Sequence, residues 1–337
     1  KERSQSIGII GAGPAGLSAA EELRKKGYQI SIYDRYDRAG GLLIYGIPNF
    51  KLEKYVVERR TQILKKSGII FYQDFEVGKT KPFNYLRKKH DAILVATGVY
   101  KARDLNIPGI KLSNIFPALD FLIASNRKGL GDSVPNFDNG RLNAKKKNVV
   151  VVGGGDTAMD CVRTAVRQGA QNVKCLYRRN RENMPGSMRE VLHAEEEGVE
   201  FKWLSVPINI FGNKQVDAIE VAKVKLGKPD ASGRESPKIL AKDTLKLKAD
   251  MVIKALGFNP EPLPKLFNHP SLQVTKWGTI KIDHETMMTN QPGIFAAGDI
   301  VRGASLVVWA IRDGRDAAKS IDNYLSKNIN KEEAKQF

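Results

Sequence analysis

The stretch of sequence that decides the fold is Ser6–Gly16, SIGIIGAGPAG. Its apolar run predicts a buried parallel strand, and three glycines follow in the spacing Gly-x-Gly-x-x-Gly. Beyond the last glycine, apolar residues recur at helical spacing over Leu17–Lys26. A second apolar run, Gln29–Tyr33, predicts the next strand, and Asp34 stands at its end. This order of strand, glycine turn, helix and strand predicts a dinucleotide-binding unit.

Each glycine of the turn has a different physical role. Gly11 permits the tight turn, Gly13 lets the backbone approach a pyrophosphate, and Gly16 lets the helix pack closely on the strand. The N-terminus of the helix then faces the phosphates. Asp34 follows at about the 20-residue distance at which a carboxylate bonds a ribose hydroxyl. The alternative interpretation is a glycine-rich turn followed by a surface aspartate.

A second stretch, Asn148–Ala158, repeats the pattern with the letters NVVVVGGGDTA. Ala158 stands in place of the third glycine, which this pattern tolerates. We expect a helix from this turn through Arg167 and a strand at Asn172–Leu176. Two such units in one chain of 337 residues agree with the roughly two domains expected from its length.

Arginines stand after the second strand of this unit, where the first unit has an acid. The run Tyr177–Arg181 reads YRRNR. A carboxylate at this place bonds a ribose hydroxyl, whereas arginines accommodate a 2′-phosphate. The first unit is therefore expected to bind an unphosphorylated adenosine, and the second to bind NADP. The alternative for the arginines is a solvated basic loop.

Further segments suggest that the first cofactor is FAD. The run Gly40–Leu42 follows the predicted ribose-binding acid closely, and Ala96–Gly98 follows a predicted strand at Ala92–Val95. An extended segment precedes Phe295–Asp299, which ends in a Gly-Asp pair. A helix is predicted at Ser305–Ala318, and its N-terminal dipole would stabilise negative charge on a reduced flavin.

Composition excludes several classes of protein. A hydrophobic fraction of 42% is ordinary for a globular chain, and no apolar run approaches the ~20 residues that span a bilayer. The 2 cysteines exclude a disulfide scaffold and a self-contained iron–sulfur cluster, which takes four thiolates. The net charge is +18, and the basic residues are scattered along the chain among acidic ones. This pattern favours a solvated basic surface over binding to an acidic partner or a polyanionic ligand. Neither nucleic acid nor membrane is an expected partner.

The whole chain resembles the two-dinucleotide flavoproteins, and most closely the family of small (β) subunits of bacterial NADPH-dependent glutamate synthase. Adrenodoxin-reductase-like and dihydropyrimidine-dehydrogenase flavin domains are similar at a greater distance. The stretches that carry the resemblance are Gly40–Pro48, Gly153–Ala165, Cys175–Arg179, Met184–Ser187, Glu195–Phe201 and Ala297–Arg315.

This resemblance implies an α/β fold with two Rossmann-like domains, in which an NADPH-binding domain is inserted into an FAD-binding domain. The expected segments are 1–144 for the first part of the FAD domain, 145–259 for the NADPH domain and 260–337 for the second part. The family carries an iron–sulfur domain ahead of its flavin region. Cys161 and Cys175 are predicted to be packing residues, so 4Fe–4S clusters are expected only on a missing N-terminal domain or on a partner. The absence of an initiator Met favours removal of that domain.

The resemblance also implies a function in glutamate biosynthesis. A hydride would pass from NADPH to FAD, and electrons would then leave for iron–sulfur centres. The chain would thus be the electron-input flavoprotein oxidoreductase of glutamate synthase, whose large subunit makes glutamate from glutamine and 2-oxoglutarate. Two alternatives are a free-standing NADPH–ferredoxin-type reductase and a non-enzymatic flavin-binding interaction module. The expected location is cytoplasmic.

No side chain is predicted to act as a catalyst, and no metal ligands are predicted. The residues predicted to bind FAD are Gly11, Gly13, Pro14, Ala15, Gly16, Asp34, Arg35, Gly41, Leu42, Val77, Thr97, Gly98, Gly298, Asp299, Ser305, Leu306 and Val307. The residues predicted to bind NADPH are Gly154, Gly155, Asp156, Thr157, Arg178, Arg179, Arg181, Leu256 and Gly257.

Overall fold

The computed structural model describes residues 2–229 and 235–333. The chain divides into two compact units, and it passes between them four times. The first unit contains the residues up to Tyr45, Leu52–Lys101, and the residues from Phe258 onward. The second unit contains Gly46–Lys51 and Ala102–Gly257. Most of the second unit is therefore an insertion in the sequence of the first.

The first unit is built on a five-stranded parallel sheet. Its strand order is β15-β4-β1-β2-β3, so the order reverses between β1 and β4. Ligands of open parallel sheets bind beside such a reversal, at the carboxyl ends of the strands. The strands are β1 (Ser6–Ile10), β2 (Gln29–Tyr33), β3 (Ile70–Tyr72), β4 (Ala92–Val95) and β15 (Ile294–Ala296).

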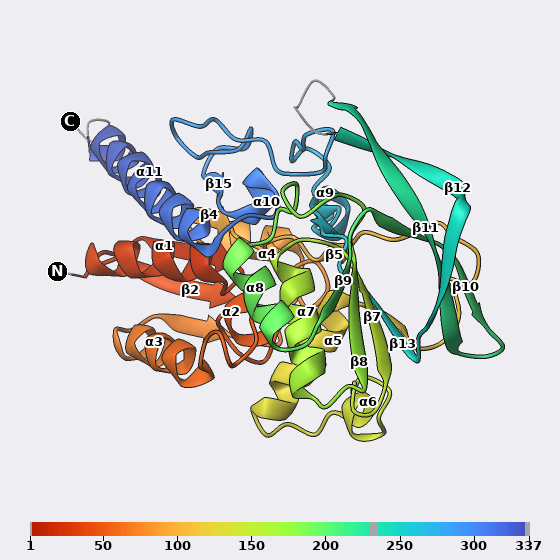
Figure 1. Cartoon of the computed structure of the whole chain (residues 1–337). Helices are drawn as coiled ribbons and strands as arrows, with labels where there is room; N and C mark the ends of the chain where they lie inside the picture. Colours follow the sequence, from red (N-terminus) through yellow and green to blue (C-terminus); the bar gives the residue numbers. More distant parts are fainter. Residues whose placement is uncertain (1, 230–234, 334–337) are drawn as a thin grey trace. The chain divides into compact units, whose positions relative to one another are not determined.

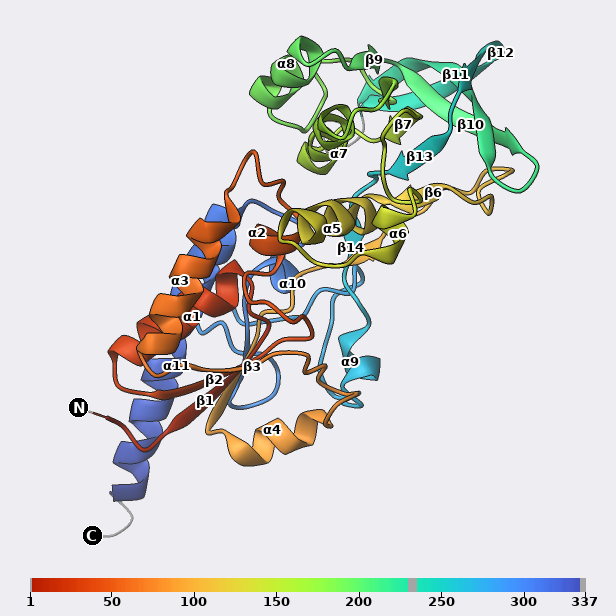
Figure 2. The same cartoon turned by 90° about the horizontal axis from the view of Figure 1, so that it is seen from below.

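Helices cover both faces of this sheet (Figure 2). α1 (Pro14–Lys25), α3 (Lys54–Lys66) and α11 (Val307–Glu333) lie on one face, and α4 (Phe83–Lys89) lies on the other. The short helices of the unit are α2 (Leu42–Tyr45), α9 (Leu263–Leu266) and α10 (Asp299–Arg302).

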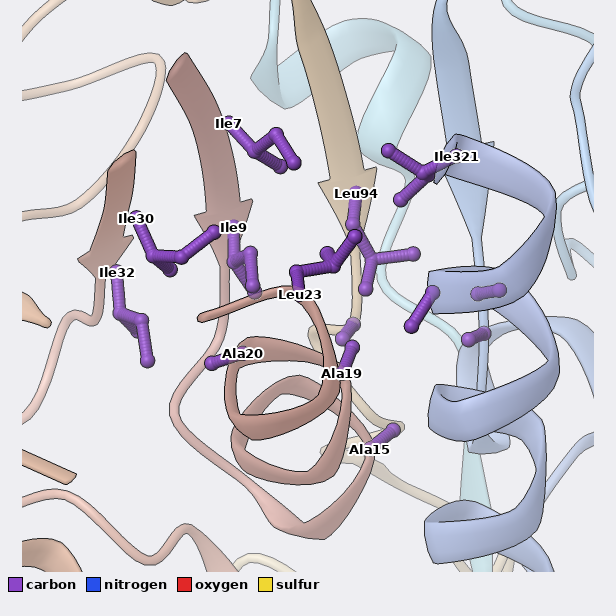
Figure 3. Packing of buried hydrophobic residues seen from close by; sticks show 14 of the residues in the cluster. Ile7, Ile9, Ala15, Ala19, Ala20, Leu23, Ile30, Ile32, Leu94 and Ile321 are labelled. Atoms are coloured by element: carbon purple, nitrogen blue, oxygen red, sulfur yellow. The ribbon is translucent and has the colours of Figure 1, made fainter. Parts of the chain in front are cut away.

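The buried residues of the strands alternate between the two faces, as the two-residue period of a strand requires. Ile7 and Ile9 of β1 pack with Leu23 of α1 and Ile321 of α11 (Figure 3). Ile10 points to the other face and joins the cluster that contains α4. Because both faces are buried, the strands appear in the sequence as continuous apolar runs.

The second unit repeats this arrangement. Its five-stranded parallel sheet has the order β6-β13-β7-β8-β9, with β7 in the place that β1 holds in the first unit. The strands are β6 (Ile115–Pro117), β7 (Asn148–Val152), β8 (Asn172–Leu176), β9 (Glu200–Lys202) and β13 (Met251–Lys254).

The two faces of the second sheet are covered differently. One face packs against α5 (Ala118–Gly129), α7 (Asp156–Arg167) and α8 (Met188–Glu196). The other packs against an antiparallel sheet, which forms a curved layer in Figure 1. Its strands are β10 (Ser205–Gly212), β11 (Val216–Pro229) and β12 (Glu235–Lys248), and the remaining elements of the chain are α6 (Pro135–Asp138), β5 (Lys101–Ala102) and β14 (Phe258–Asn259).

The predicted α/β fold with two Rossmann-like units is confirmed, and two details of the prediction are corrected. The helix predicted at Ser305–Ala318 begins at Val307 and continues to Glu333, because Ile321 and Leu325 extend its buried stripe. The border predicted at 144/145 does not coincide with the division of the units. Residues 102–144 belong to the second unit, since β6 pairs with β13 in its sheet.

None of the helices within the described ranges is both long and apolar enough to cross a membrane. The same ranges contain no cluster of three or more His, Cys, Asp or Glu side chains that could hold a metal ion.

Two candidate dinucleotide-binding sites

The first glycine turn joins β1 to α1 in a form that only glycine permits at two of its positions. Gly11 has φ +106°, and a Cβ atom there would lie 2.3 Å from the Ala96 carbonyl oxygen. A Cβ atom on Gly16 would lie 2.0 Å from the Gly11 carbonyl oxygen. Gly13 differs, because a Cβ atom there would meet no described atom within 4 Å. Gly13 is also the N-cap of α1, and no side chain caps that helix. The backbone at Gly13 is therefore open to a phosphate group.

Asp34 is held rigidly at the end of β2. Its Oδ2 accepts a hydrogen bond of 2.6 Å from the Ala12 backbone N–H, and its Oδ1 accepts one of 2.8 Å from Tyr36. Burial raises the pKa of Asp34, and these two hydrogen bonds oppose that effect. A carboxylate has about four acceptor positions, so this one can still bond a ribose hydroxyl.

A pocket of about 310 Å³ adjoins Asp34. Five predicted residues line it, and so do three that the sequence did not single out: Tyr36, Tyr100 and Glu261. The Arg35 guanidinium forms an ion pair of 2.9 Å with Glu261 and lies 4.8 Å from the centre of the Tyr100 ring. No local pattern marks Glu261, because it reaches the pocket from a distant part of the chain. The predicted residues that line the pocket are Gly11, Asp34, Arg35, Val77 and Thr97.

The glycine pair after the second strand, which was predicted to lie along the cofactor, lies against the first turn. The Gly40 N–H donates to the Ala12 carbonyl oxygen at 2.8 Å. A Cβ atom on Gly41, where φ is +54°, would lie 2.9 Å from the Gly13 Cα.

Thr97 lies just after β4. Its Oγ1 atom is buried and makes no hydrogen bond to any described residue. Buried hydroxyls normally have a partner, so this atom fits a ligand contact.

α11 reaches the same turn because it crosses α1 closely (Figure 1). A Cβ atom on Gly314 would lie 2.2 Å from the Ala15 carbonyl oxygen, and Ser18 Oγ donates to the Ile311 carbonyl oxygen at 3.0 Å. A Cβ atom on Gly298 would lie 2.9 Å from the Ala15 Cβ. The predicted segment from Gly298 to Val307 is thereby brought to the N-terminal end of α1.

Asp299 stands beside Gly298 at the start of α10. Burial raises its pKa to about 6, although the Ser305 backbone N–H donates to its carboxylate. Nearby Asp313, which forms an ion pair of 2.6 Å with Arg302, adds to the rise. The next apolar residues, Leu306 and Val307, are exposed. The segment from Asp299 to Val307 therefore offers a carboxyl group whose protonation changes near neutral pH, together with exposed apolar side chains.

Asp299→Asn should change the pH dependence of stability in the FAD-free chain. A carboxyl group with a raised pKa stabilises the folded state fully below its ordinary pKa, and this contribution is lost as pH rises through about 6. The free energy of unfolding of the variant, relative to the parent, should therefore rise by about 2 kcal/mol between pH 4 and pH 7. Urea unfolding at the two pH values measures this, with the exposed Asp243→Asn as a control. An equal shift in both variants would contradict the assignment.

The second glycine turn joins β7 to α7 with the same division of roles. Gly153 has φ +150°, and a Cβ atom there would lie 2.1 Å from the Ala255 carbonyl oxygen. A Cβ atom on Gly154 would lie 2.3 Å from the Tyr177 ring, whereas Gly155 has no described atom within 4 Å of that position. Gly155 is the N-cap of α7, which no side chain caps. Gly153 and Gly155 thus correspond to Gly11 and Gly13, and Gly153 is not among the residues predicted to bind NADPH.

The segment that follows β13 lies against the second glycine turn. The segment that follows β4 lies against the first glycine turn in the same way. Ala255 touches Gly153 as Ala96 touches Gly11. Leu256 and Gly257 follow, and Gly257 has φ +88°. The predicted pair therefore lies at the carboxyl end of β13, next to the strand that carries the turn.

The three predicted arginines differ in their surroundings. Arg178 is exposed and forms no hydrogen bond or ion pair with any described residue. Arg179 donates from Nε to the Glu235 carbonyl oxygen at 3.0 Å. Arg181 forms an ion pair of 2.8 Å with Glu195. Arg178 is therefore the guanidinium that is free to bind a phosphate.

A loop that the sequence did not assign to the site is hydrogen-bonded to residues of the second turn. The Gly186 N–H donates to the Gly154 carbonyl oxygen at 3.0 Å, and the Ser187 N–H donates to Asp156 Oδ1 at 2.9 Å. The Tyr177 hydroxyl donates to the Asn183 carbonyl oxygen at 2.8 Å. Asp156 thus holds this loop, whereas it had been predicted only as a cofactor contact.

The family model described as pyridine nucleotide-disulphide oxidoreductase matches residues 5–314. The chain belongs to this family. The predicted oxidoreductase class is confirmed, and so is the resemblance to glutamate synthase small subunits.

Relatives in this oxidoreductase family include the glutamate synthase NADPH small chain of Azospirillum brasilense. It is 61% identical over 324 residues, which are 96% of this chain and 67% of that protein. The small chain of Escherichia coli K12 is 43% identical, over 96% of this chain and 70% of that protein. Among solved structures, FprA from Mycobacterium tuberculosis aligns with a TM-score of 0.83 at 20% identity, over 98% of this chain and 87% of that one.

Neither cysteine of this family member is exposed, although the family description refers to disulphides. Cys161 and Cys175 are fully buried in the helix-covered core of the second unit. Burial raises the pKa of Cys175 to about 12 and also raises that of Cys161, so both remain thiols. Their prediction as packing residues is confirmed.

Proposed function

We propose that this chain binds NADPH at the second glycine turn and FAD at the first, and that a hydride would pass directly from NADPH to FAD, as the electron-input step of a glutamate synthase. The observation that carries the proposal is the contrast between corresponding strand ends. β2 is followed directly by a buried, hydrogen-bonded Asp34, whereas Arg178, soon after β8, pairs with none of the described residues. A carboxylate suits a ribose hydroxyl, and a guanidinium suits a 2′-phosphate.

The residues of the first site fit FAD in several ways. Gly13 leaves open space for a pyrophosphate, and Asp34 can bind the adenosine ribose. The unpartnered Thr97 hydroxyl and the buried Asp299 carboxyl group offer polar contacts further along the cofactor. When bound, the flavin accepts a hydride and releases electrons singly. α11 begins at Val307, and the positive end of its helix dipole would stabilise negative charge on a reduced flavin bound there.

The residues of the second site fit NADPH by the same reasoning. Gly155 leaves the N-terminus of α7 open for a pyrophosphate, and Arg178 is free for the 2′-phosphate. Thr157 follows in the first turn of that helix. The predicted contacts at Leu256 and Gly257 remain part of this proposal.

Electrons would leave this chain for iron–sulfur centres on another polypeptide segment or subunit. The two cysteines of the chain are too few for a cluster, which normally takes four thiolates. The relatives named as glutamate synthase small chains support a large subunit as partner. Glutamate would be made there from glutamine and 2-oxoglutarate, in the cytoplasm.

Anaerobic mixing with NADPH tests the proposal directly. The FAD-loaded chain should lose its flavin absorbance rapidly, and NADPH should act at concentrations at least about 10-fold lower than NADH, as expected for one lost charge-assisted contact. Bound flavin that NADPH does not bleach would indicate a binding module instead. Reduction of a ferredoxin without any glutamate synthase large subunit would favour a free-standing reductase.

A further inference from the structure

One short segment, Gly46–Lys51, belongs by its contacts to the second unit, although the chain on both sides of it belongs to the first. We call this segment the strap. It follows α2 directly, and α2 follows the Gly40–Gly41 pair at the proposed flavin site. The Gly46 carbonyl oxygen accepts a hydrogen bond of 3.4 Å from Asn126 of α5. The strap is therefore attached to the helical layer of the second unit from its first residue.

Lys51 attaches the other end of the strap through two carboxylates. Its Nζ lies 2.8 Å from Asp160 Oδ1 on α7 and 3.2 Å from Glu190 Oε2 on α8. The three side chains are 23%, 11% and 15% exposed, so water screens these charges only partly. Burial by itself would lower the pKa of Lys51, but the two carboxylates raise it. The ammonium group therefore stays charged in this contact.

A chain of alternating charges continues from this contact. Arg163 forms ion pairs of 2.7 Å with Glu190 and with Glu197, and Arg167 forms one of 2.8 Å with Glu197. The strap adds a second contact here, because the Phe50 ring centre lies 4.8 and 4.3 Å from the guanidinium carbons of the two arginines. The strap thus contributes both an ammonium group and an aromatic ring to the network.

Asp160 depends on Lys51 more than Glu190 does. Glu190 is also paired with Arg163, whereas Lys51 is the sole cation paired with Asp160 among the described residues. Burial raises the pKa of Asp160, and Lys51 opposes this rise. Asp160 lies one helical turn beyond Asp156 at the start of α7, where the proposed NADPH phosphates bind. The same helix therefore carries the proposed nucleotide site and the partner of Lys51.

We propose that Lys51 is a positioning residue for hydride transfer. This inference rests on the proposed function. The ion pairs of Lys51 fasten the strap to α7 and α8, and the strap continues the backbone from the proposed flavin-contacting pair Gly40–Gly41. The printed partners of Lys51 among the described residues are Asp160 and Glu190, which lie outside both glycine turns, so its loss should leave the binding contacts of both cofactors in place. The rate of hydride transfer should suffer instead, because misplacement by about 1 Å can slow a reaction about 100-fold.

The test compares Lys51→Met with Lys174→Met in the full FAD-loaded chain. Lys174 pairs with Glu200 in the same unit, and no ion pair or hydrogen bond among the described residues joins it to the strap. In anaerobic stopped-flow experiments, Lys51→Met should slow flavin reduction at saturating NADPH by at least about 10-fold. Its FAD content and its NADPH Kd should change by less than about 2-fold. For the control Lys174→Met, the reduction rate, the FAD content and the NADPH Kd should all change by less than about 2-fold. Lys51→Arg should restore the rate to within about 3-fold, because a guanidinium can bond both carboxylates.

A second variant, Asp160→Asn, keeps a hydrogen-bond acceptor for Lys51 and removes one charge. It should slow reduction in the same direction, and its effect should not multiply with that of Lys51→Met, because both changes break one contact. An unchanged rate of flavin reduction by NADPH in the Lys51→Met variant would overturn the inference. Loss of FAD or NADPH binding in proportion to the rate, in both variants, would also overturn it. Failure of the parent chain to be reduced by NADPH would instead refute the proposed function.

Discussion

Gly13→Ala should weaken FAD binding by about 10- to 100-fold while the chain keeps its fold, because overpacking a site costs about 1–3 kcal/mol. A Cβ atom at this position meets no described protein atom within 4 Å, and the backbone there, with φ −79°, suits alanine. The new methyl group would occupy only the space proposed for the pyrophosphate. FAD affinity can be measured by the fluorescence change on flavin binding. The free energy of unfolding of the FAD-free chain should fall by no more than about 1 kcal/mol, the usual effect at an N-cap.

Gly11→Ala is the matched comparison, two residues away in the same turn. There the added Cβ atom would lie 2.3 Å from the Ala96 carbonyl oxygen, at a φ of +106°. We expect it to destabilise the FAD-free chain by at least about 3 kcal/mol, from strain and overpacking together. Equal losses of stability in the two variants would show that the space at Gly13 is not reserved for a ligand.

Arg178→Gln should weaken NADPH binding by about 10- to 100-fold and leave NADH binding unchanged. The loss of a charge-assisted hydrogen bond to a 2′-phosphate costs about 1.5–3 kcal/mol. NADH lacks this phosphate, so its affinity should not depend on the guanidinium. Titration of the FAD-loaded chain with NADP and NAD analogues that cannot be oxidised gives both dissociation constants.

Arg181→Gln is the control for this prediction, because its guanidinium already pairs with Glu195. Arg179→Gln should have an intermediate effect, since Arg179 donates one hydrogen bond to the Glu235 carbonyl oxygen. If Arg178→Gln weakened NADH as much as NADPH, the arginine would not be reading the 2′-phosphate. If Arg181→Gln had the largest effect, the ranking of the three arginines would be wrong.

The strands and glycine turns were predictable because their signals are local. The structure has the predicted bounds for the strands Gln29–Tyr33, Ala92–Val95 and Asn172–Leu176, since strands buried on both faces appear as uninterrupted apolar runs. The roles of Gly11 and Gly16 follow from spacing, because the turn that they form is closed by atoms a few residues away or on the adjacent strand. The role of Gly153 was not predicted, because its close neighbour, the Ala255 carbonyl oxygen, comes from a distant strand.

The extent of α11 and the border of the second unit were not predictable in this way. The helix continues past Ala318 because its later apolar residues pack on the first unit, whose sheet is formed by distant segments. The glycines of residues 102–144 do not follow the Gly-x-Gly-x-x-Gly spacing, and the place of this segment is set by the pairing of β6 with β13.

The sequence by itself determined the two dinucleotide turns, the acid at Asp34 and the basic run after β8. Tertiary structure decided which of these groups are free to bind. Within the described part of the chain Arg178 has no partner, while Arg181 pairs with Glu195 and Arg35 pairs with Glu261. It also placed Lys51 between Asp160 and Glu190. Spacing along a chain fixes local turns, but a charge is paired or free according to which distant side chains the fold brings within a few ångströms.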